Sequence, residues 1–253
     1  MTPTRISIFG LGYVGAVSAA CLARDGHTVV GVDPNQAKVD LINAGQSPIV
    51  EKGLDELIRS GVASGRLAAG TDAATGVARS DLSFVCVGTP SADNGSLDLR
   101  YVEAVCREIG AALRHKASPH TVVIRSTILP GTMRNVVLPA LRESSGKEPG
   151  RDFAVLNNPE FLREGTAVND YYQPPKTVIG AMSPSAAAPL EAVYADLPGP
   201  KITTSLETAE LVKYVDNVWH ALKVGFANEV GAVCKQLGID SHPLMDIFCQ
   251  DQK

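Results

Sequence analysis

Short apolar segments rich in β-branched residues alternate along this chain with longer segments of helical periodicity. The apolar segments are RISIF, HTVVGV, DLSFVCV, TVVIRS, FAVLN, KTVIG and PKITT, and the helical ones include Val14–Arg24, Asn35–Asn43, Leu99–Leu113 and Thr132–Arg142. Such alternation is typical of a parallel sheet covered by helices on both faces, and a nearly continuous apolar strand such as SFVCV suits burial on both sides. We therefore expect a doubly wound α/β domain over residues 1–204.

The pattern changes in the last fifth of the chain. From Leu206 to Leu237 helical periodicity continues without a break, which is too long for a helix that merely connects two strands. We expect a second, helical domain to begin at residue 205 and to continue to 253. An apolar row follows one face of the long helix: Leu211, Val215, Val218, Leu222, Val230 and Val233.

A second row on this helix is mostly polar. Its members recur at steps of four, three, four and four and so share a face: Lys213, Asn217, His220, Val224 and Asn228. Solvated faces usually carry Glu and Lys, whereas single Lys, His and Asn side chains suit directed hydrogen bonds. Spacing alone leaves open whether the row is solvated or faces a ligand.

Charge and cysteine content exclude several classes of protein. A net charge of −4 over 253 residues argues against binding to nucleic acid or to a membrane surface. The five cysteines are scattered, odd in number and without metal-ligand spacing, which suits a reducing compartment. The N-terminus, MTPTRISIFG, runs directly into a predicted strand and has no apolar segment of signal-peptide or membrane length. We expect a cytoplasmic protein without a metal site.

The segment IFGLGYVG contains the pattern Gly-x-Gly-x-x-Gly at Gly10, Gly12 and Gly15. The pattern alone is weak, but here it follows a predicted strand and opens a predicted helix. In that setting Gly10 makes a tight turn, Gly12 lets a pyrophosphate approach the backbone, and Gly15 allows close packing of the helix. The phosphates would lie at a helix N-terminus, where free N–H groups favour anions.

The second strand ends in Asp33, at about the distance expected for an acidic residue that hydrogen-bonds the adenosine ribose. This carboxylate would repel a 2′-phosphate, and the following PNQ offers no arginine to neutralise one. The sequence therefore predicts a Rossmann-like domain that binds NAD rather than NADP. Lys38 could reach the cofactor, or could simply be a solvated lysine on a helix.

Three further loops follow predicted strands and should face the same crevice, because open parallel sheets bind ligands at the carboxyl ends of their strands. CVGTP carries Thr89, RSTILPG carries Ser126 and Thr127, and NNPEFLREG carries Glu160 and Glu164. The simplest interpretation of the last loop is a solvated helix start, with Asn158 as N-cap and Pro159 at the first helical position.

Taken together, these pieces resemble the UDP-glucose/GDP-mannose dehydrogenase family. The segments that carry the resemblance are GLGYVG, CVGTP, RSTILPGT, NNPEFLREGTAVNDY and AELVKYVDNVWHALKVGFANEVG, and they cover nearly the whole chain. Within the family, QSPIVEKGLDEL, NVWHALKVGFANE and MDIFCQDQK are most similar to the members that oxidise GDP-mannose to GDP-mannuronate, an alginate precursor. A UDP-sugar substrate is the alternative, because the chemistry of these residues does not discriminate between the two.

The resemblance implies a reaction and a role for individual residues. The family oxidises a primary alcohol to a carboxylate by two hydride transfers to NAD, through a thioester on a cysteine. By resemblance, Glu164 activates water to hydrolyse the thioester, Lys213 and Asn217 stabilise the developing oxyanion, and Thr127 lies beside cofactor and water. The remaining matches are cofactor contacts at Tyr13, Val14, Asp33, Lys38 and Thr89, and substrate contacts at His220 and Asn228. Glu160 is then expected to anchor its loop.

The sequence departs from the family at its C-terminal end. The family's nucleophile lies in a Gly-Gly-Ser-Cys segment, and neither this segment nor the second nucleotide-binding domain occurs within these 253 residues. We expect a fragment that is inactive alone. Cys249 has no basic neighbour to activate it and is expected to be a structural helix cysteine; Cys86 is expected in the core.

Two classes of function remain open at this point: the cofactor part of a dehydrogenase, or a non-catalytic NAD-binding and dimerisation module. In either case the apolar row on the long helix predicts at least a homodimer.

Overall fold

The computed structural model describes residues 3–250 and divides into two compact units, 1–211 and 212–253. The boundary expected from the sequence, 204/205, falls slightly earlier, just before the long helix. The first unit is built on a single eight-stranded sheet. Its strands are β1 (Arg5–Phe9), β2 (Thr28–Val32), β3 (Leu67–Gly70), β4 (Leu82–Val85), β5 (Thr121–Ile124), β6 (Ala154–Asn157), β7 (Thr177–Ala181) and β8 (Lys201–Thr204).

The strand order is β3-β2-β1-β4-β5-β6-β7-β8, so the first six strands follow the Rossmann order. The order reverses between β1 and β4, which places a topological switch point there, where ligands bind such sheets. Strands β1 to β6 are parallel, as expected. The predicted parallel sheet departs from parallel pairing at one position, because β7 is antiparallel to β6, whereas β8 is parallel to β7.

The reversal at β7 follows from the connection that precedes it. Between β6 and β7 the only helix is α7 (Ala167–Tyr172), which has six residues. A helix of that length rises by about 9 Å, which is less than the length of a strand. The chain therefore re-enters the sheet at the same end of the strands at which it left, and β7 runs antiparallel to β6.

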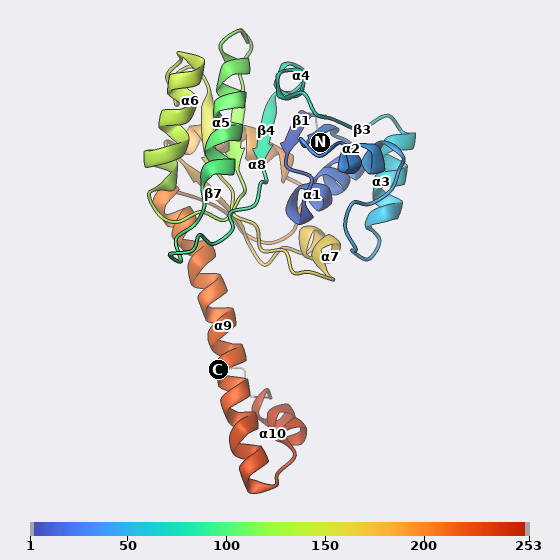
Figure 1. Cartoon of the computed structure of the whole chain (residues 1–253), viewed down its shortest axis with the longest axis vertical. Helices are drawn as coiled ribbons and strands as arrows, with labels where there is room; N and C mark the ends of the chain where they lie inside the picture. The colour runs from blue at the N-terminus through green and yellow to red at the C-terminus, as the bar shows by residue number, and fades with distance from the viewer. Residues whose placement is uncertain (1–2, 251–253) are drawn as a thin grey trace. The chain divides into compact units, whose positions relative to one another are not determined.

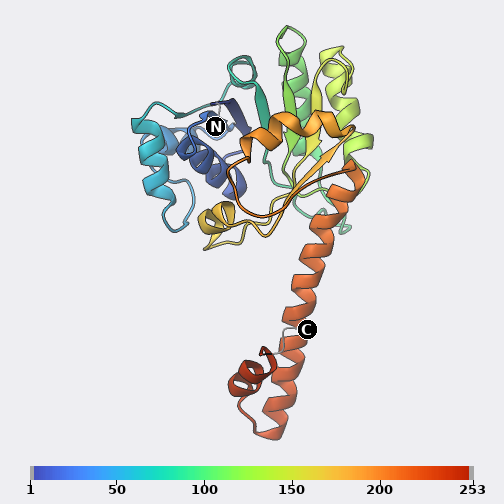
Figure 2. The same cartoon turned by 180° about the vertical axis from the view of Figure 1, so that it is seen from behind.

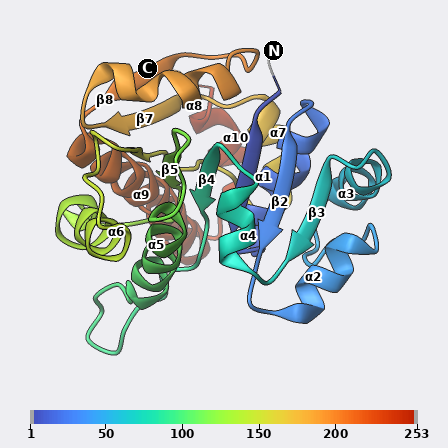
Figure 3. The same cartoon turned by 90° about the horizontal axis from the view of Figure 1, so that it is seen from above.

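Helices pack on both faces of the sheet (Figure 1), and Figure 3 shows the two layers from above. Helices α1 (Tyr13–Arg24), α2 (Gln36–Asn43), α3 (Leu54–Ala63), α7 and α8 (Ala188–Val193) contribute side chains to one core cluster. Helices α4 (Ala73–Ala78), α5 (Arg100–Leu113) and α6 (Leu138–Ser145), with a π-helical turn before α6 (Met133–Val137), contribute to the other. From behind, α8 crosses the face opposite α5 and α6 (Figure 2).

Alternating side chains of the central strands supply both clusters. Ile6 and Ile8 of β1 pack on the side of α1, and Phe9 packs on the side of α5. Likewise Phe84 and Val85, neighbours in β4, face opposite layers. This double burial explains why these strands are apolar at almost every position.

The long helix α9 (Leu206–Leu237) is continuous, as predicted, and α10 (Ser241–Phe248) follows it. Within the second unit the rings of Phe226 and Phe248 lie 5.4 Å apart, and Cys234 is buried. Most of the predicted apolar row on α9 is exposed; Val215 is 59% exposed and Leu222 61%.

Candidate functional site

The glycine-rich loop joins β1 to α1 at the switch point. Each of its three glycines lies in a different environment, so each lacks a side chain for a different physical reason. Gly10 adopts a positive φ of 93°, and a Cβ there would lie 3.0 Å from the carbonyl oxygen of Cys86. A Cβ on Gly15 would come within 1.8 Å of the Gly10 carbonyl oxygen. A Cβ on Gly12 would meet nothing within 4 Å. Gly10 and Gly15 are therefore required by packing, whereas Gly12 borders open space.

The helix that follows this loop presents a suitable end to an anion. Gly12 is the N-cap of α1, and it provides no side-chain capping bond to the first N–H groups. The first turn carries no acidic residue. Uncapped N–H groups and the positive end of a 12-residue helix dipole favour a phosphate beside Gly12. The chain thus fits the pyrophosphate of a dinucleotide at this loop.

Asp33, at the end of β2, has a structural task as well as its predicted one. Its carboxylate is buried and accepts hydrogen bonds from the backbone N–H groups of Leu11, at 2.7 Å, and Asn35, at 2.9 Å. Lys38 lies 3.3 Å from the same carboxylate and forms an ion pair with it. Asp33 therefore holds the glycine loop in place, and Lys38 is more than a solvated lysine. Their contacts with the cofactor remain predictions.

The loops after β4 and β5 are tied to each other on the other side of the switch point. The Thr89 hydroxyl donates to the carbonyl oxygen of Thr127 at 2.7 Å, and the Ser126 hydroxyl donates to that of Val87 at 2.6 Å. The two threonines predicted beside the cofactor are thus adjacent. Cys86, at the end of β4, lies in the core as expected, and burial raises the pKa of its thiol to about 12.

The loop after β6 differs from the expected helix start. Residues 158–163 are not helical, and α7 begins only at Ala167. Asn158 is not an N-cap, because its side chain donates to the Val178 carbonyl oxygen and accepts from Arg125 and Tyr194. Glu160 is buried and accepts from the Leu162 N–H at 2.7 Å. Glu164 is exposed.

A buried polar cluster lies beneath this loop and was not predicted. The guanidinium of Arg125 is buried and donates to the side chains of Asn158 and Tyr194. A cavity of about 30 Å³ adjoins it, and Glu160 also lines this cavity. These residues come from three distant segments, so no spacing in the sequence could have revealed them.

The remaining predicted residues lie on α9 in the second unit. Lys213 is buried, whereas Asn217, His220 and Asn228 are exposed. The first unit therefore brings together Gly10, Gly12, Tyr13, Val14, Gly15, Asp33, Lys38, Thr89, Thr127 and Glu164 on loops and helix starts at the carboxyl ends of neighbouring strands.

The environment of Cys249 differs from the one expected. It was expected to be a structural cysteine within a helix, but it is the exposed C-cap residue of α10 and packs in neither core cluster.

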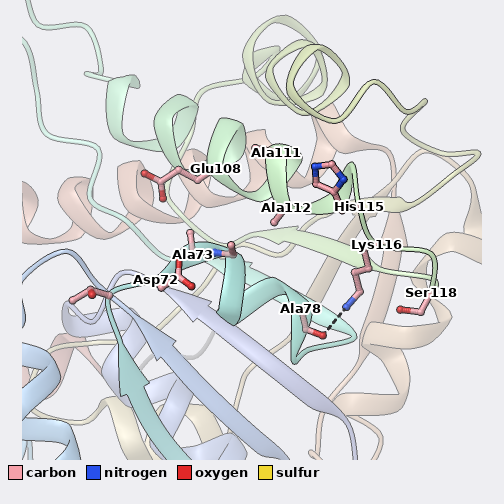
Figure 4. A pocket seen from close by; sticks show the side chains of 11 residues that line it. Asp72, Ala73, Ala78, Glu108, Ala111, Ala112, His115, Lys116 and Ser118 are labelled. Atoms are coloured by element: carbon pink, nitrogen blue, oxygen red, sulfur yellow. Dashed lines mark hydrogen bonds between the residues drawn. The ribbon is translucent and has the colours of Figure 1, made fainter.

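A separate groove of about 800 Å³ lies between α4 and α5 (Figure 4). It contains none of the predicted site residues. The ammonium group of Lys116 at this groove donates to the carbonyl oxygens of Val77 and Ser80, at 2.8 and 2.6 Å, and so caps the end of α4. The charge of this lysine therefore serves the fold.

The described residues lack the features of two other classes of site. Within residues 3–250, no group of three or more His, Cys, Asp or Glu side chains is arranged to hold a metal ion. No helix in that range combines the length and apolar character needed to cross a membrane.

Comparison with known proteins agrees with this geometry. A GDP-mannose 6-dehydrogenase of Pseudomonas aeruginosa is 56% identical over 249 residues, which are 98% of this chain and 57% of the relative. A UDP-glucose 6-dehydrogenase of Haloferax volcanii is 39% identical over 98% of this chain and 59% of the relative. A ternary complex of GDP-mannose dehydrogenase from Pseudomonas aeruginosa superposes with a TM-score of 0.97 and 56% identity, covering 98% of this chain and 57% of that one.

The chain thus spans less than two thirds of the length of these relatives. Residues 4–198 match the NAD-binding domain of one family, and residues 207–253 match the central domain of the same family. Both matches agree with the glycine loop, Asp33 and the long helix described above. The chain belongs to the UDP-glucose/GDP-mannose dehydrogenase family.

Proposed function

We propose that this chain is the cofactor-binding part of an NAD-dependent nucleotide-sugar 6-dehydrogenase that converts GDP-mannose to GDP-mannuronate, a precursor of alginate. The observation that carries the proposal is the 56% identity to a GDP-mannose 6-dehydrogenase over 98% of the chain. The described UDP-glucose relative reaches 39% over a similar length. A UDP-sugar substrate is the alternative that this difference disfavours.

In this proposal the edge of the sheet holds the cofactor. The N–H groups at the start of α1 bind the pyrophosphate beside Gly12, and Asp33 accepts from the adenosine ribose hydroxyls. This site would supply the hydride acceptor: the oxidation of an alcohol to a carboxylate releases two hydrides, and two NAD molecules bound in turn would take up one each. Thr89 and Thr127, linked by a hydrogen bond of 2.7 Å, fix the loops beside the nicotinamide.

The proposed chemistry of the chain's own residues concerns proton transfer and charge. Glu164 takes a proton from the water that hydrolyses the thioester; its exposure in this chain leaves the carboxylate accessible. Lys213 and Asn217, one turn apart on α9, supply a positive charge and an amide donor for the developing oxyanion. His220 and Asn228 contact the sugar nucleotide.

The proposal separates into two measurements. Calorimetry on the 253-residue chain should detect NAD binding. The same chain incubated with both NAD and GDP-mannose should yield no steady production of NADH, because the family's cysteine segment does not occur within these residues. A protein that joins this chain to that segment and the C-terminal domain should reduce NAD with GDP-mannose in preference to UDP-glucose. A preference for UDP-glucose would contradict the substrate. NAD binding without turnover of either sugar nucleotide in the joined protein would favour a non-catalytic module.

A further inference from the structure

The segment between α2 and α3 contains a carboxylate that is buried although it lies in a loop. Glu51, in SPIVEKG, is only 8% exposed. Its Oε2 atom accepts a hydrogen bond from the Tyr13 hydroxyl and another from the Gly165 N–H, at 2.8 Å. Glu51 thus joins three segments that are far apart in the sequence: its own loop, the start of α1, and the loop after β6.

The Tyr13 hydroxyl, which donates to this carboxylate, contacts the residues on both sides of Glu164. The Tyr13 hydroxyl also lies 3.1 Å from the carbonyl oxygen of Arg163 and 3.0 Å from the Gly165 nitrogen. Arg163 and Gly165 are the residues before and after Glu164. The peptide groups that flank Glu164 are therefore both held by Tyr13, and the one that follows it is also held by Glu51.

The loop around Glu164 is fixed from its other side by Asp170. The carboxylate of Asp170 accepts from the Arg163 N–H at 2.9 Å and from its guanidinium at 2.7 and 3.0 Å. Gly165 has a φ of 86°, which a residue with a side chain adopts only with strain. With one side anchored and the turn conformation fixed, Tyr13 and Glu51 set the position of the loop on the side of the cofactor.

The other end of this linkage is the cofactor loop. Tyr13 is the first residue of α1 and directly follows Gly12, the glycine that borders open space. Burial, and then the hydrogen bond to Glu51, raise the pKa of the Tyr13 phenol, so its hydroxyl remains protonated and able to donate.

We propose that Glu51 is a positioning residue that transmits occupancy of the cofactor loop to the backbone around Glu164. This rests on the proposed function, in which NAD binds beside Gly12 and Glu164 is the base. A cofactor that fixes the first turn of α1 also fixes the Tyr13 hydroxyl, and through Glu51 the Gly165 N–H. The Glu164 loop is then more ordered when NAD is bound than when it is absent. A merely structural Glu51 would hold Gly165 equally in both states.

Amide hydrogen exchange at Gly165 in the 253-residue chain, measured by NMR with and without saturating NAD, tests the linkage. In the unmodified chain NAD should slow exchange at Gly165 about tenfold, the equivalent of one strengthened hydrogen bond. Glu51→Gln keeps the shape of the side chain and removes its charge. It should still bind NAD, but the effect of NAD on Gly165 should fall below about twofold.

Two further variants complete the test. Asp55→Asn is the matched control, because Asp55 accepts from the Ser47 N–H in the same segment and touches neither Tyr13 nor Gly165; it should retain the full NAD effect. Tyr13→Phe removes the link from the other end and should also abolish the effect, which covers the case that Glu51→Gln does not fold. An equal NAD effect in Glu51→Gln or Tyr13→Phe, or none in an unmodified chain that binds NAD, overturns the linkage alone. An unmodified chain that does not bind NAD overturns the proposed function as well.

Discussion

At the scale of single residues, Asp33 shows how one carboxylate can serve both fold and function. It accepts from the N–H groups of Leu11, within the glycine loop, and Asn35, it pairs with Lys38, and it lies where a ribose would bind. Three donors leave a carboxylate with capacity for a further hydrogen bond, because its two oxygens offer about four acceptor positions. The sequence predicted the position of Asp33 but could not predict that it braces the loop.

Replacing Asp33 with Ala should therefore weaken NAD binding and reduce the discrimination against NADP. Each lost charge-assisted hydrogen bond is worth about 1.5–3 kcal/mol, so NAD affinity should fall at least about tenfold. Calorimetry with both cofactors measures the effect. Asp72→Ala is the control: Asp72 caps α4 through the Ala74 and Thr75 N–H groups, and its loss should cost stability but not affinity. Equal affinity for NAD and NADP in the unmodified chain would contradict the role of Asp33.

His120 gives the molecule a predictable dependence on pH. It is buried, with its Nε2 atom 2.8 Å from the Ser83 hydroxyl, and burial lowers its pKa to about 4 from 6.5. Between these values the unfolded chain binds a proton that the folded chain excludes. Stability is therefore fully present above pH 6.5 and falls as the pH drops toward 4, by about 3 kcal/mol in all.

Urea unfolding at pH 7.5, 5 and 4 measures this loss. His120→Gln should flatten the dependence, because the unfolded chain then has no histidine to protonate at this position. His27, whose pKa burial also lowers, should leave a smaller residual slope. The exposed His115 provides the control, since His115→Gln should leave the slope unchanged. A slope that persists in full in His120→Gln would show that another group titrates.

At the scale of secondary structure, the sequence predicted what local pattern determines and missed what distant contacts decide. RISIF forms β1 at the residues expected, because each of its apolar positions is buried by one of the two helical layers. The strand Leu67–Gly70 was missed, since LAAG contains no β-branched or aromatic residue. The predicted helix start at Asn158 failed because Arg125, Tyr194 and the Val178 carbonyl oxygen occupy its side chain.

Glu210, in the first turns of α9, makes further contacts that no sequence pattern predicted. It is 1% exposed and accepts from the N–H groups of Gly131 and Met133, at 2.8 and 2.7 Å. It thereby joins α9 to the loop that follows Thr127. Glu210→Ala would leave two N–H groups without acceptors and should lower the free energy of unfolding by about 2–4 kcal/mol.

Chemical denaturation of the chain checks this value. The control is Glu207→Ala, one turn earlier, which removes an exposed ion pair with Arg134 and should cost less than about 1 kcal/mol. Equal losses in the two variants would show that Glu210 does not anchor the loop.

At the scale of the whole molecule, the sequence predicted which strand ends carry the site but not how the loops are tied together. Local sequence pattern shows where a strand ends, so Asp33, Thr89 and Thr127 could be identified as the residues that follow predicted strands. The links from Glu51 to Tyr13 and Gly165 span 38 and 114 residues and depend on the folded topology. The links that hold the Glu164 loop therefore could not be predicted from the sequence alone.

The exposed face of α9 leads to a prediction about assembly. Leu211, Val215, Val218 and Leu222 are each at least half exposed and lie on one side of the helix. Apolar area of this extent is usually covered by a partner, so we expect sedimentation velocity to detect at least a dimer. Leu222→Lys should shift the equilibrium toward monomer, whereas Lys223→Glu, also exposed on this helix, should not. A monomer mass that is independent of concentration would contradict the expectation.

The last prediction concerns the reaction of a protein that carries this chain together with the family's cysteine segment. Glu164→Gln keeps the shape of the side chain and removes the base, so turnover should fall about 10²–10⁴-fold. If hydrolysis is the step lost, NADH should form in a burst and the acyl group should remain on the cysteine as an adduct visible by intact-mass spectrometry. Glu160→Gln is the comparison, because Glu160 accepts from the Leu162 N–H within its own loop and should affect stability more than turnover. A slow Glu164→Gln enzyme without a trapped adduct would assign the base to another group, and Glu160, five residues before the Gly165 turn, would then be the first to test.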